Sequence, residues 1–186
     1  MMQITVGISG ASGVIYALKL LKILKDLNVK VHLVITRAGK KIIKYETGLT
    51  ENVIIPLATY YHNVDDLTSP ISSGSFKTDG MVVVPCSMKT LAGIVVGYSS
   101  NLLLRAADVT LKERRPLVLV PRETPLSIVH LENMYKAALA GATVLPAMPG
   151  FYHEPKSIDD LVNHIVGKIL DVFHLEHKLY KRWKMQ

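Results

Sequence analysis

The sequence predicts a three-layer α/β fold built on a doubly wound parallel sheet. Short apolar runs alternate along the chain with longer segments in which apolar residues recur at helical spacing. Several short runs are apolar throughout, which is typical of parallel strands that helices cover on both faces. The 186 residues suit one domain, and we expect it to span residues 1–186 and to end in a helical tail.

The first unit of this pattern lies within residues 4–35. Residues 4–8 form an expected strand, and a turn with glycines at Gly10 and Gly13 follows it. From Val14 to Leu27 the apolar residues share one helical face, and residues 31–35 form the next strand. A strand, a helix and a second strand in such short succession predict a parallel pair joined by a right-handed crossover.

The same order of elements returns further along the chain. Asn101 is placed to cap a helix, and Ser157 with Asp160 fits a capping box. We expect strands at 81–85, 117–121 and 143–145, and helices that end near 96 and 114, span 127–140, and run from 157 past 173.

Two segments break this alternation. Residues 60–80 are rich in turn formers, and residues 146–156 carry three prolines. Both segments follow strands, so we expect long loops at the carboxyl edge of the sheet. Open α/β sheets bind their ligands at that edge.

The net charge of +7 suits nucleic acid or small anionic ligands as partners. Many of the basic residues lie in three stretches, at 37–44, 112–115 and 178–184. These stretches lack the interleaved aromatic residues that binding of single-stranded nucleic acid requires. We therefore expect small phosphorylated ligands and no nucleic acid. No apolar stretch approaches the roughly 20 residues of a membrane span, so we expect no membrane partner and a cytoplasmic protein.

The turn from Gly10 to Gly13 is the first candidate ligand site. Glycines let the backbone approach a ligand, and the start of the following helix offers free N–H groups to a phosphate. Counted from Gly7, the spacing is G-x-x-G-x-x-G, which is neither the dinucleotide fingerprint nor a Walker loop. A tight turn without a ligand is the alternative.

The segment Pro85–Thr90 is the second candidate. The hydroxyls of Ser87 and Thr90 could cap a helix, or they could form an anion cradle together with Lys89. We interpret the single cysteine, Cys86, as structural rather than as a nucleophile, because it ends a buried strand.

Charged side chains near the later strands give further candidates. Arg122 follows the strand at 117–121, where a guanidinium suits phosphate, whereas the run at 112–115 resembles a solvated helix end. The pair Asp159–Asp160 is better explained as a helix cap than as a metal ligand, and we expect no metal site.

Four segments of the chain resemble the flavin prenyltransferases of the UbiX type. They are Gly-Ala-Ser-Gly at 10–13, Pro-Cys-Ser-Met-Lys-Thr at 85–90, the block from Arg105 to Pro125, and Leu145 to Tyr152. The resemblance implies a flavodoxin-like, FMN-binding domain that assembles into a dodecamer. It also implies metal-independent transfer of a dimethylallyl group from dimethylallyl phosphate to N5 and C6 of reduced FMN. The product, prenylated FMN, would serve a UbiD-type decarboxylase in ubiquinone synthesis or aromatic-acid breakdown.

The resemblance also assigns roles to single residues. The implied catalytic residues are Glu46, Glu123 and Ser12, the last of them near N5 of the flavin. Tyr152 and Lys168 would bind the dimethylallyl phosphate, with Arg105 and Lys112 reaching it from a neighbouring subunit. The implied FMN-binding residues are Gly10, Ala11, Ser12, Thr36, Ser87, Met88, Lys89, Thr90 and Arg122.

In two respects the chain departs from its relatives. Many relatives carry Arg in place of Lys168, so we expect this side chain to bind the phosphate more weakly here. Some relatives also place a tryptophan over the flavin near the position of Leu67, whereas the only tryptophan here is Trp183 in the tail.

Two other functions remain as alternatives. Flavin-dependent cysteine decarboxylases share the fold, but they carry an Asn-containing motif where this chain has Pro146–Gly150. An FMN carrier for a partner decarboxylase would keep the flavin residues. A carrier would have no need for the donor-binding set of Tyr152, Lys168, Arg105 and Lys112.

Overall fold

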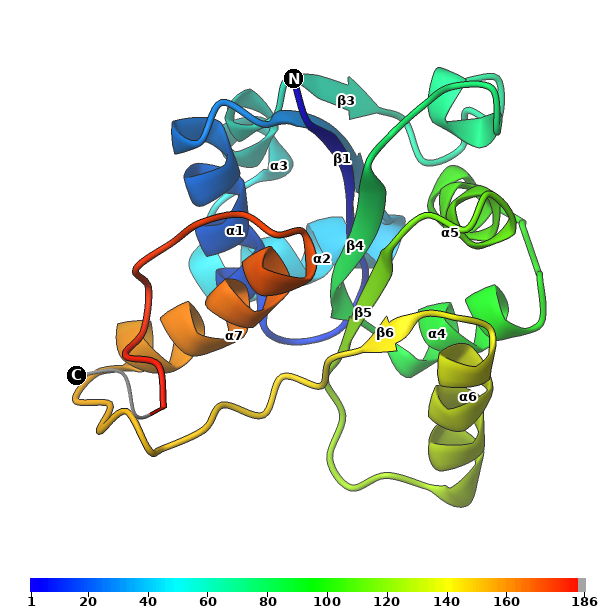
Figure 1. Ribbon diagram of the computed structural model, residues 1–186. Helices are drawn as coiled ribbons and strands as arrows, with labels where there is room; N and C mark the ends of the chain where they lie inside the picture. Colours follow the sequence, from blue (N-terminus) through cyan, green and yellow to red (C-terminus); the bar gives the residue numbers. More distant parts are fainter. Residues whose placement is uncertain (184–186) are drawn as a thin grey trace.

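The computed structural model describes residues 1–183, so Lys184 of the third basic stretch lies outside the described residues. Its strands are β1 (Gln3–Ile8), β2 (Lys30–Ile35), β3 (Tyr60–His62), β4 (Gly80–Cys86), β5 (Leu117–Pro121) and β6 (Thr143–Val144). They form one sheet in the order β3-β2-β1-β4-β5-β6, in which every neighbouring pair is parallel (Figure 1). The predicted doubly wound parallel sheet is therefore confirmed.

Helices cover both faces of this sheet and complete the three layers (Figure 1). They are α1 (Val14–Asp26), α2 (Arg37–Thr47), α3 (Glu51–Ile54), α4 (Met88–Val95), α5 (Leu102–Lys112), α6 (Ile128–Leu139) and α7 (Ile158–Val172). Side chains of α1, α2, α3 and α7 belong to the core on one face, and those of α4, α5 and α6 to the core on the other. No helix within residues 1–183 combines the length and apolar character needed to cross a membrane.

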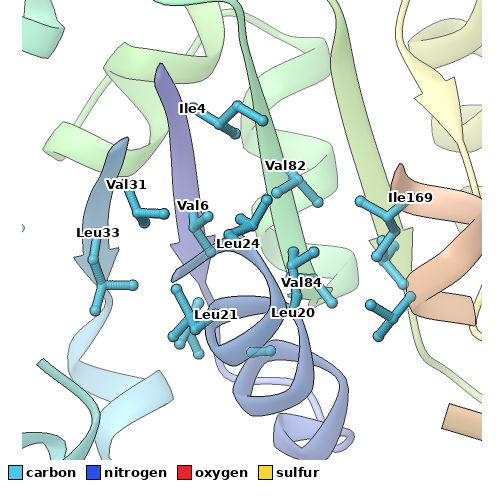
Figure 2. Packing of buried hydrophobic residues seen from close by; sticks show 14 of the residues in the cluster. Ile4, Val6, Leu20, Leu21, Leu24, Val31, Leu33, Val82, Val84 and Ile169 are labelled. Carbon is cyan, nitrogen blue, oxygen red and sulfur yellow. The ribbon is translucent and has the colours of Figure 1, made fainter. Parts of the chain in front are cut away.

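Alternating strand side chains build the two cores. On β4, Val82 and Val84 belong to the core beneath α1 and α7, whereas Met81 and Val83 belong to the core beneath α4 and α5. Figure 2 shows the first of these cores, where Leu24 of α1 lies against the strands. Because both faces are covered, every residue of β4 is buried, which explains its unbroken apolar run.

The winding of the sheet reverses between β1 and β4. The chain moves outward from β1 to β2 and β3, and then returns to β4 on the other side of β1. Ser9 ties the two strand ends together, since its hydroxyl donates to the Pro85 carbonyl at 2.8 Å and accepts from the Ser87 N–H at 2.7 Å. Ligands of open α/β sheets bind in the crevice at such a reversal.

Several elements were not predicted from the sequence. The helix α2 lies at 37–47, where basic residues are as frequent as apolar ones, and the short helix α3 follows it. The edge strand β3 and a short 3₁₀ helix (Pro70–Ser72) lie within the expected loop at 60–80. The strand β3 has three residues, too few to show a period in the sequence. The segment 146–156 contains neither helix nor strand, as predicted.

The tail also differs from the prediction. The helix α7 ends at Val172, and residues 173–183 contain neither helix nor strand, so a helical tail is wrong for the residues that the structure describes. Side chains of the tail bind the last turn of α7 instead. The Tyr180 hydroxyl donates to Asp171 at 2.7 Å, and the Arg182 guanidinium pairs with the same carboxylate at 2.6 Å. These bonds hold the tail along the helix.

Candidate active site

A cleft of about 670 Å³ opens at the carboxyl ends of β1, β2 and β4. It lies at the reversal of the sheet, where the topology predicts a ligand site. Five of the nine residues expected to bind FMN line it, namely Gly10, Thr36, Ser87, Lys89 and Thr90. The sequence therefore identified five of the seventeen residues that line this cleft, from segments that are far apart along the chain.

Glycines bring the walls of the cleft together. A Cβ on Gly10 would lie 2.5 Å from the Cβ of Ala38, and one on Gly39 would lie 2.7 Å from the Ile8 carbonyl oxygen. Both separations are shorter than non-bonded carbon contacts allow. The first turn of α2 can lie against the end of β1 only because these side chains are absent.

Two hydroxyl groups at the cleft also cap helices. The Thr36 hydroxyl accepts from the Gly39 N–H at 2.9 Å at the start of α2. The Ser87 hydroxyl accepts from the Thr90 N–H at 3.3 Å at the start of α4, and it donates to the Thr90 hydroxyl at 3.0 Å. Capping, one of the two interpretations left open for Ser87, is therefore confirmed. The first turns of both helices line the cleft and direct partial positive charge into it.

The other expected FMN residues surround the cleft less directly. Ala11 and Met88 are buried, and Ser12 is half-buried in the turn before α1. The Arg122 N–H donates to the Cys86 carbonyl at 3.4 Å, which places Arg122 beside the end of β4. Within residues 1–183, its buried Nε has no hydrogen-bond partner. A buried guanidinium nitrogen without a partner suits an anionic ligand.

Cys86 lies beside these residues but is fully buried. Burial raises the pKa of the Cys86 thiol well above its usual range. Because the thiolate is the reactive form, this cysteine is a poor nucleophile at neutral pH. The structural interpretation of Cys86 agrees with this environment.

Glu46, in the last turn of α2, lies at the start of α1. Its carboxylate accepts from the Gly13 N–H at 3.0 Å and from the Val14 N–H at 2.9 Å. A carboxylate at this position is stabilised by the positive end of the helix dipole. The side chain of Glu46 thus reaches the same turn that carries Ser12, although 33 residues separate it from Gly13.

Glu123 follows Arg122 in the loop after β5. It is exposed, and its carboxylate accepts from the neighbouring Thr124 N–H at 3.1 Å. Among residues 1–183 the hydrogen bonds of Glu123 are all to its neighbour Thr124, and its catalytic role stays a prediction.

Tyr152 and Lys168 lie in a cluster of rings built by α7, the loop before it and the tail. The Tyr152 hydroxyl is 3.1 Å from Nε2 of His164, and Lys168 Nζ lies 5.7 Å from the centre of the Tyr180 ring. Trp183 meets Tyr152 edge to face, with ring centres 5.5 Å apart. The sequence identified Tyr152 and Lys168 but did not predict that the rings of His153, His164, Tyr180 and Trp183 lie with them.

A signal for one of the missed residues was present in the sequence. His164 stands four residues before Lys168 within a predicted helix, so the two side chains share one helical face. No comparable signal existed for Trp183, because its contact with Tyr152 depends on how the tail folds back along α7.

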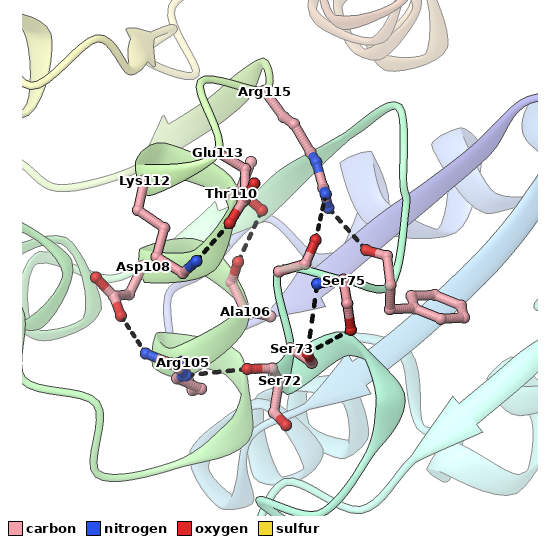
Figure 3. A network of polar contacts seen from close by, with 12 residues as sticks. Ser72, Ser73, Ser75, Arg105, Ala106, Asp108, Thr110, Lys112, Glu113 and Arg115 are labelled. Atoms are coloured by element: carbon pink, nitrogen blue, oxygen red, sulfur yellow. Dashed lines mark hydrogen bonds and ion pairs between the residues drawn. The ribbon is translucent and has the colours of Figure 1, made fainter.

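Arg105 and Lys112 lie on α5, which belongs to the core on the other face of the sheet from α7. Figure 3 shows both side chains beside the loop at 72–75. Arg105 pairs with Asp108 at 2.6 Å and donates to the Ser72 carbonyl at 3.0 Å, and Lys112 pairs with Glu113. One chain therefore does not bring them to Tyr152 and Lys168, and their role from a neighbouring subunit stays a prediction.

Comparisons with known proteins give this geometry a context. Residues 1–170 match the model of the family described as flavoprotein. The chain is 51% identical over 182 residues to a protein of Methanocaldococcus jannaschii named flavin prenyltransferase UbiX, and the match covers 98% of each chain.

Two solved structures are similar to the chain over nearly its whole length. A crystal structure described as AnUbiX (PadA1) in complex with FMN and dimethylallyl pyrophosphate has a TM-score of 0.97 and 48% identity, covering 100% of this chain and 98% of that chain. A structure described as a dodecameric, FMN-dependent UbiX-like decarboxylase from Escherichia coli O157:H7 has a TM-score of 0.96 and 49% identity, covering 99% and 100%.

Proposed function

Because the chain belongs to the flavin prenyltransferases of the flavoprotein family, we propose that it joins a dimethylallyl group to N5 and C6 of reduced FMN. The donor is dimethylallyl phosphate, whose allylic C–O bond breaks as the phosphate leaves. The product, prenylated FMN, is used by a UbiD-type decarboxylase. The observation that carries this proposal is the cleft at the reversal of the sheet, which gathers five of the expected flavin-binding residues.

The residues present fit FMN. A cleft of about 670 Å³ is of the size that small-molecule ligands occupy. The first turns of α2 and α4 offer N–H groups and the positive ends of helix dipoles to the phosphate, and Lys89 adds a full charge. The partnerless Nε of Arg122 completes this anion-binding set. The group supplies the nucleophilic atoms N5 and C6 when it is bound in its reduced form.

Positive charge on the leaving phosphate lowers the barrier to breaking the C–O bond. No metal is needed if several cationic and hydroxyl groups contact the phosphate at once. Lys168 and the Tyr152 hydroxyl supply such groups from α7 and the loop before it. Lys168 is exposed and has no carboxylate partner within residues 1–183, so its charge is available to a ligand.

Copies of the chain assemble in this proposal, as a dodecamer, so that Arg105 and Lys112 of one subunit reach the phosphate in another. This arrangement would explain why the two side chains lie on the face opposite Lys168 in one chain. Their present partners within one chain are the acids Asp108 and Glu113.

Glu46, Glu123 and Ser12 handle protons in the proposed reaction. Bonds from the donor to N5 and C6 would replace one hydrogen on each atom, and the second bond requires a proton to be added to the donor's double bond, so one proton is released overall. A carboxylate nearby can accept and return such protons. Glu46 is held at the turn that carries Ser12 by two N–H donors. Those bonds fix the position of the carboxylate beside Ser12.

Aromatic side chains near the donor would stabilise positive charge on the allyl group. Leu67, at the position where some relatives carry tryptophan, is exposed and offers no ring. Trp183 lies edge to face against Tyr152 and brings an aromatic ring to the donor side from the tail. The two rings together form one aromatic wall of the donor site.

The proposal is tested by the mass of the flavin. Purified protein, reduced FMN and dimethylallyl phosphate are mixed without oxygen, and the flavin is recovered and weighed by mass spectrometry. A gain of one C5H8 unit is expected. Flavin that binds but keeps its mass with both the monophosphate and the pyrophosphate would instead indicate an FMN carrier.

A further inference from the structure

His164 is a buried polar residue in the middle of α7, and the proposed reaction has not yet used it. It is 6% exposed, and both of its ring nitrogens have partners. Nδ1 lies 3.2 Å from the Gly150 backbone nitrogen, and Nε2 lies 3.1 Å from the Tyr152 hydroxyl oxygen. Both partners belong to the loop that carries the donor-binding tyrosine.

The first of these contacts fixes where the proton on the ring lies. A backbone N–H can only donate, so the Gly150 N–H donates and Nδ1 of His164 accepts. A neutral imidazole that accepts at one nitrogen carries its proton on the other. The Nε2–H of His164 therefore donates to the Tyr152 oxygen.

This arrangement determines what the Tyr152 hydroxyl can do. Its oxygen accepts from His164, so its own proton remains free to be donated elsewhere. Tyr152 is 42% exposed and faces the donor side beside Trp183, so a phosphate oxygen can reach that proton. With the opposite tautomer the tyrosine would donate to His164 and would have no proton for the phosphate.

Resting on the proposed function, we infer that His164 is a positioning residue, which holds Tyr152 as a hydrogen-bond donor to the phosphate of the dimethylallyl donor. This role requires the imidazole of His164 to be neutral, since a protonated imidazole could not accept from the Gly150 N–H at Nδ1. His164 does not touch the substrate in this account. It acts through the orientation of one hydroxyl proton.

The surroundings of His164 keep the ring neutral. His153 stacks on it in a parallel arrangement with centres 5.0 Å apart, and Lys168 lies one helical turn away. Tyr180 of the tail closes the remaining side with its ring, 4.9 Å away. The pKa of His164 is lowered mainly by burial, and to a smaller extent by His153 and then Lys168. Two acids face this group: Asp160 interacts with His153 and is occupied in the cap of α7, and Asp171 accepts from the Tyr180 hydroxyl.

Three single substitutions separate positioning from packing. His164→Phe keeps a buried ring but loses both nitrogens. His164→Gln can place an amide N–H where Nε2 lies, so it can still donate to Tyr152. His164→Asn can replace only Nδ1, so it keeps the bond to Gly150 and loses the one to Tyr152.

The readout is the steady-state rate of prenyl transfer without oxygen, measured over a range of donor concentrations. We expect H164F and H164N to lower kcat by about 5- to 10-fold, the loss of one uncharged hydrogen bond, with the donor KM changed less than about twofold. H164Q should stay within about twofold of the original rate. All three should bind FMN as the original protein does, because the cleft does not include His164.

A double substitution gives the sharper test. In a Tyr152→Phe background the hydroxyl is absent, so His164→Phe should cause no further loss of rate. The inference would be overturned if the rate losses of Tyr152→Phe and His164→Phe multiplied in the double variant. It would also be overturned if H164N were as fast as H164Q. If the unsubstituted protein transfers no prenyl group, the proposed function fails and this inference fails with it. If it transfers the group and H164F matches its rate, only the inference fails.

Discussion

Glu46 illustrates how a single residue connects two helices at the site. Its carboxylate accepts two N–H bonds at the start of α1, which an amide can match in shape but not in charge. We expect Glu46→Gln to keep its thermal midpoint within a few degrees while prenyl transfer slows by about 100-fold, as is typical of a lost acid–base group. Thermal unfolding and flavin mass spectra over time measure the two effects. A rate close to that of the original protein would remove Glu46 from the chemistry.

Lys168 is the most direct test of charge on the leaving phosphate. Lys168→Ala removes a charge-assisted hydrogen bond to the phosphate. The ratio kcat/KM for the donor should therefore fall by about 10- to 100-fold, through a higher KM or a lower kcat. Lys168→Arg keeps the charge and is the matched control, with a rate at or above the original. FMN affinity, followed by flavin fluorescence, should not change in either variant. Equal losses in both variants would indicate damage to α7 rather than a lost charge.

At the residue scale, the sequence was most informative where the backbone decides position. Gly10, Thr36, Ser87 and Lys89 follow or end strands, and parallel strands bring such residues to one edge. Contacts that depend on the folding of loops and tail could not be predicted in this way. Trp183 meets Tyr152 only because the tail turns back along α7.

At the scale of elements, a polar chain fastens β2 to the edge strand β3. Nδ1 of His32 lies 3.0 Å from Nε2 of His62, and the Ser69 hydroxyl lies 2.8 Å from Nδ1 of His62. Burial, with smaller contributions from His62 and Lys30, lowers the pKa of His32 from 6.5 to about 4. The unfolded chain therefore binds a proton more readily than the folded one in this range.

This shift predicts loss of stability in mild acid. As the pH falls from about 6.5 to about 4, proton uptake by the unfolded chain should lower the free energy of unfolding by on the order of 2 kcal/mol. His32→Asn removes the titrating group and should flatten that dependence. Urea unfolding at several pH values measures both. The same slope in both proteins would contradict the role of His32.

The tail is a second element whose attachment can be tested. Burial alone would raise the pKa of Asp171, but hydrogen bonds from Arg182, Tyr180 and His177 lower it to about 2. The attachment is therefore present above the usual carboxyl pKa near 4 and is lost only as the pH falls through about 2.

Asp171→Ala should release the tail at neutral pH. Because Trp183 is the only tryptophan, the fluorescence anisotropy of the protein without flavin reports on the tail alone. Anisotropy should fall in Asp171→Ala, and prenyl transfer should slow because the ring beside Tyr152 is lost. Asp159→Ala, which removes a surface pair with Lys19, is the control and should leave anisotropy unchanged. Unchanged anisotropy in Asp171→Ala would contradict the attachment.

Element prediction succeeded where the pattern was long and failed where it was short or charged. The strands β4 and β5 are unbroken apolar runs and were placed to within one residue at each end. The helix α2 was missed because only a few of its residues are apolar, and the three-residue strand β3 has no period to detect. A helical tail was expected as a continuation of the last helix, but its side chains bind α7 instead.

At the scale of the whole molecule, one chain leaves apolar surface uncovered. On α6, Ile128, Tyr135 and Leu139 are each at least 65% exposed. Apolar side chains gathered on one helix are typical of a contact between proteins. The proposed assembly of copies would cover them.

A substitution on α6 tests that assembly. Tyr135→Glu combined with Leu139→Glu places two charges on one face of the helix and should yield particles of lower mass in native mass spectrometry. Lys136→Glu changes the charge of the same helix at a polar position and should leave the mass unchanged. An unchanged mass in the double variant would place the contact elsewhere.

The overall fold could be predicted from the sequence because alternation of apolar runs and amphipathic helices leaves few topologies for a parallel sheet. The strand order and the reversal between β1 and β4 then determine where the cleft lies. The position of Arg105 and Lys112 relative to Lys168 of another subunit could not be predicted, because in the proposed assembly it depends on a second copy of the chain.

The central claim is that this cleft transfers a prenyl group to a flavin. Its most direct test is anaerobic incubation of the protein with reduced FMN and deuterium-labelled dimethylallyl phosphate, followed by mass spectrometry of the bound flavin. We expect the mass of the flavin to increase by one C5H8 unit that carries the label of the donor, and one inorganic phosphate to be released per flavin. A flavin of unchanged mass, or phosphate released without a labelled flavin, would contradict it.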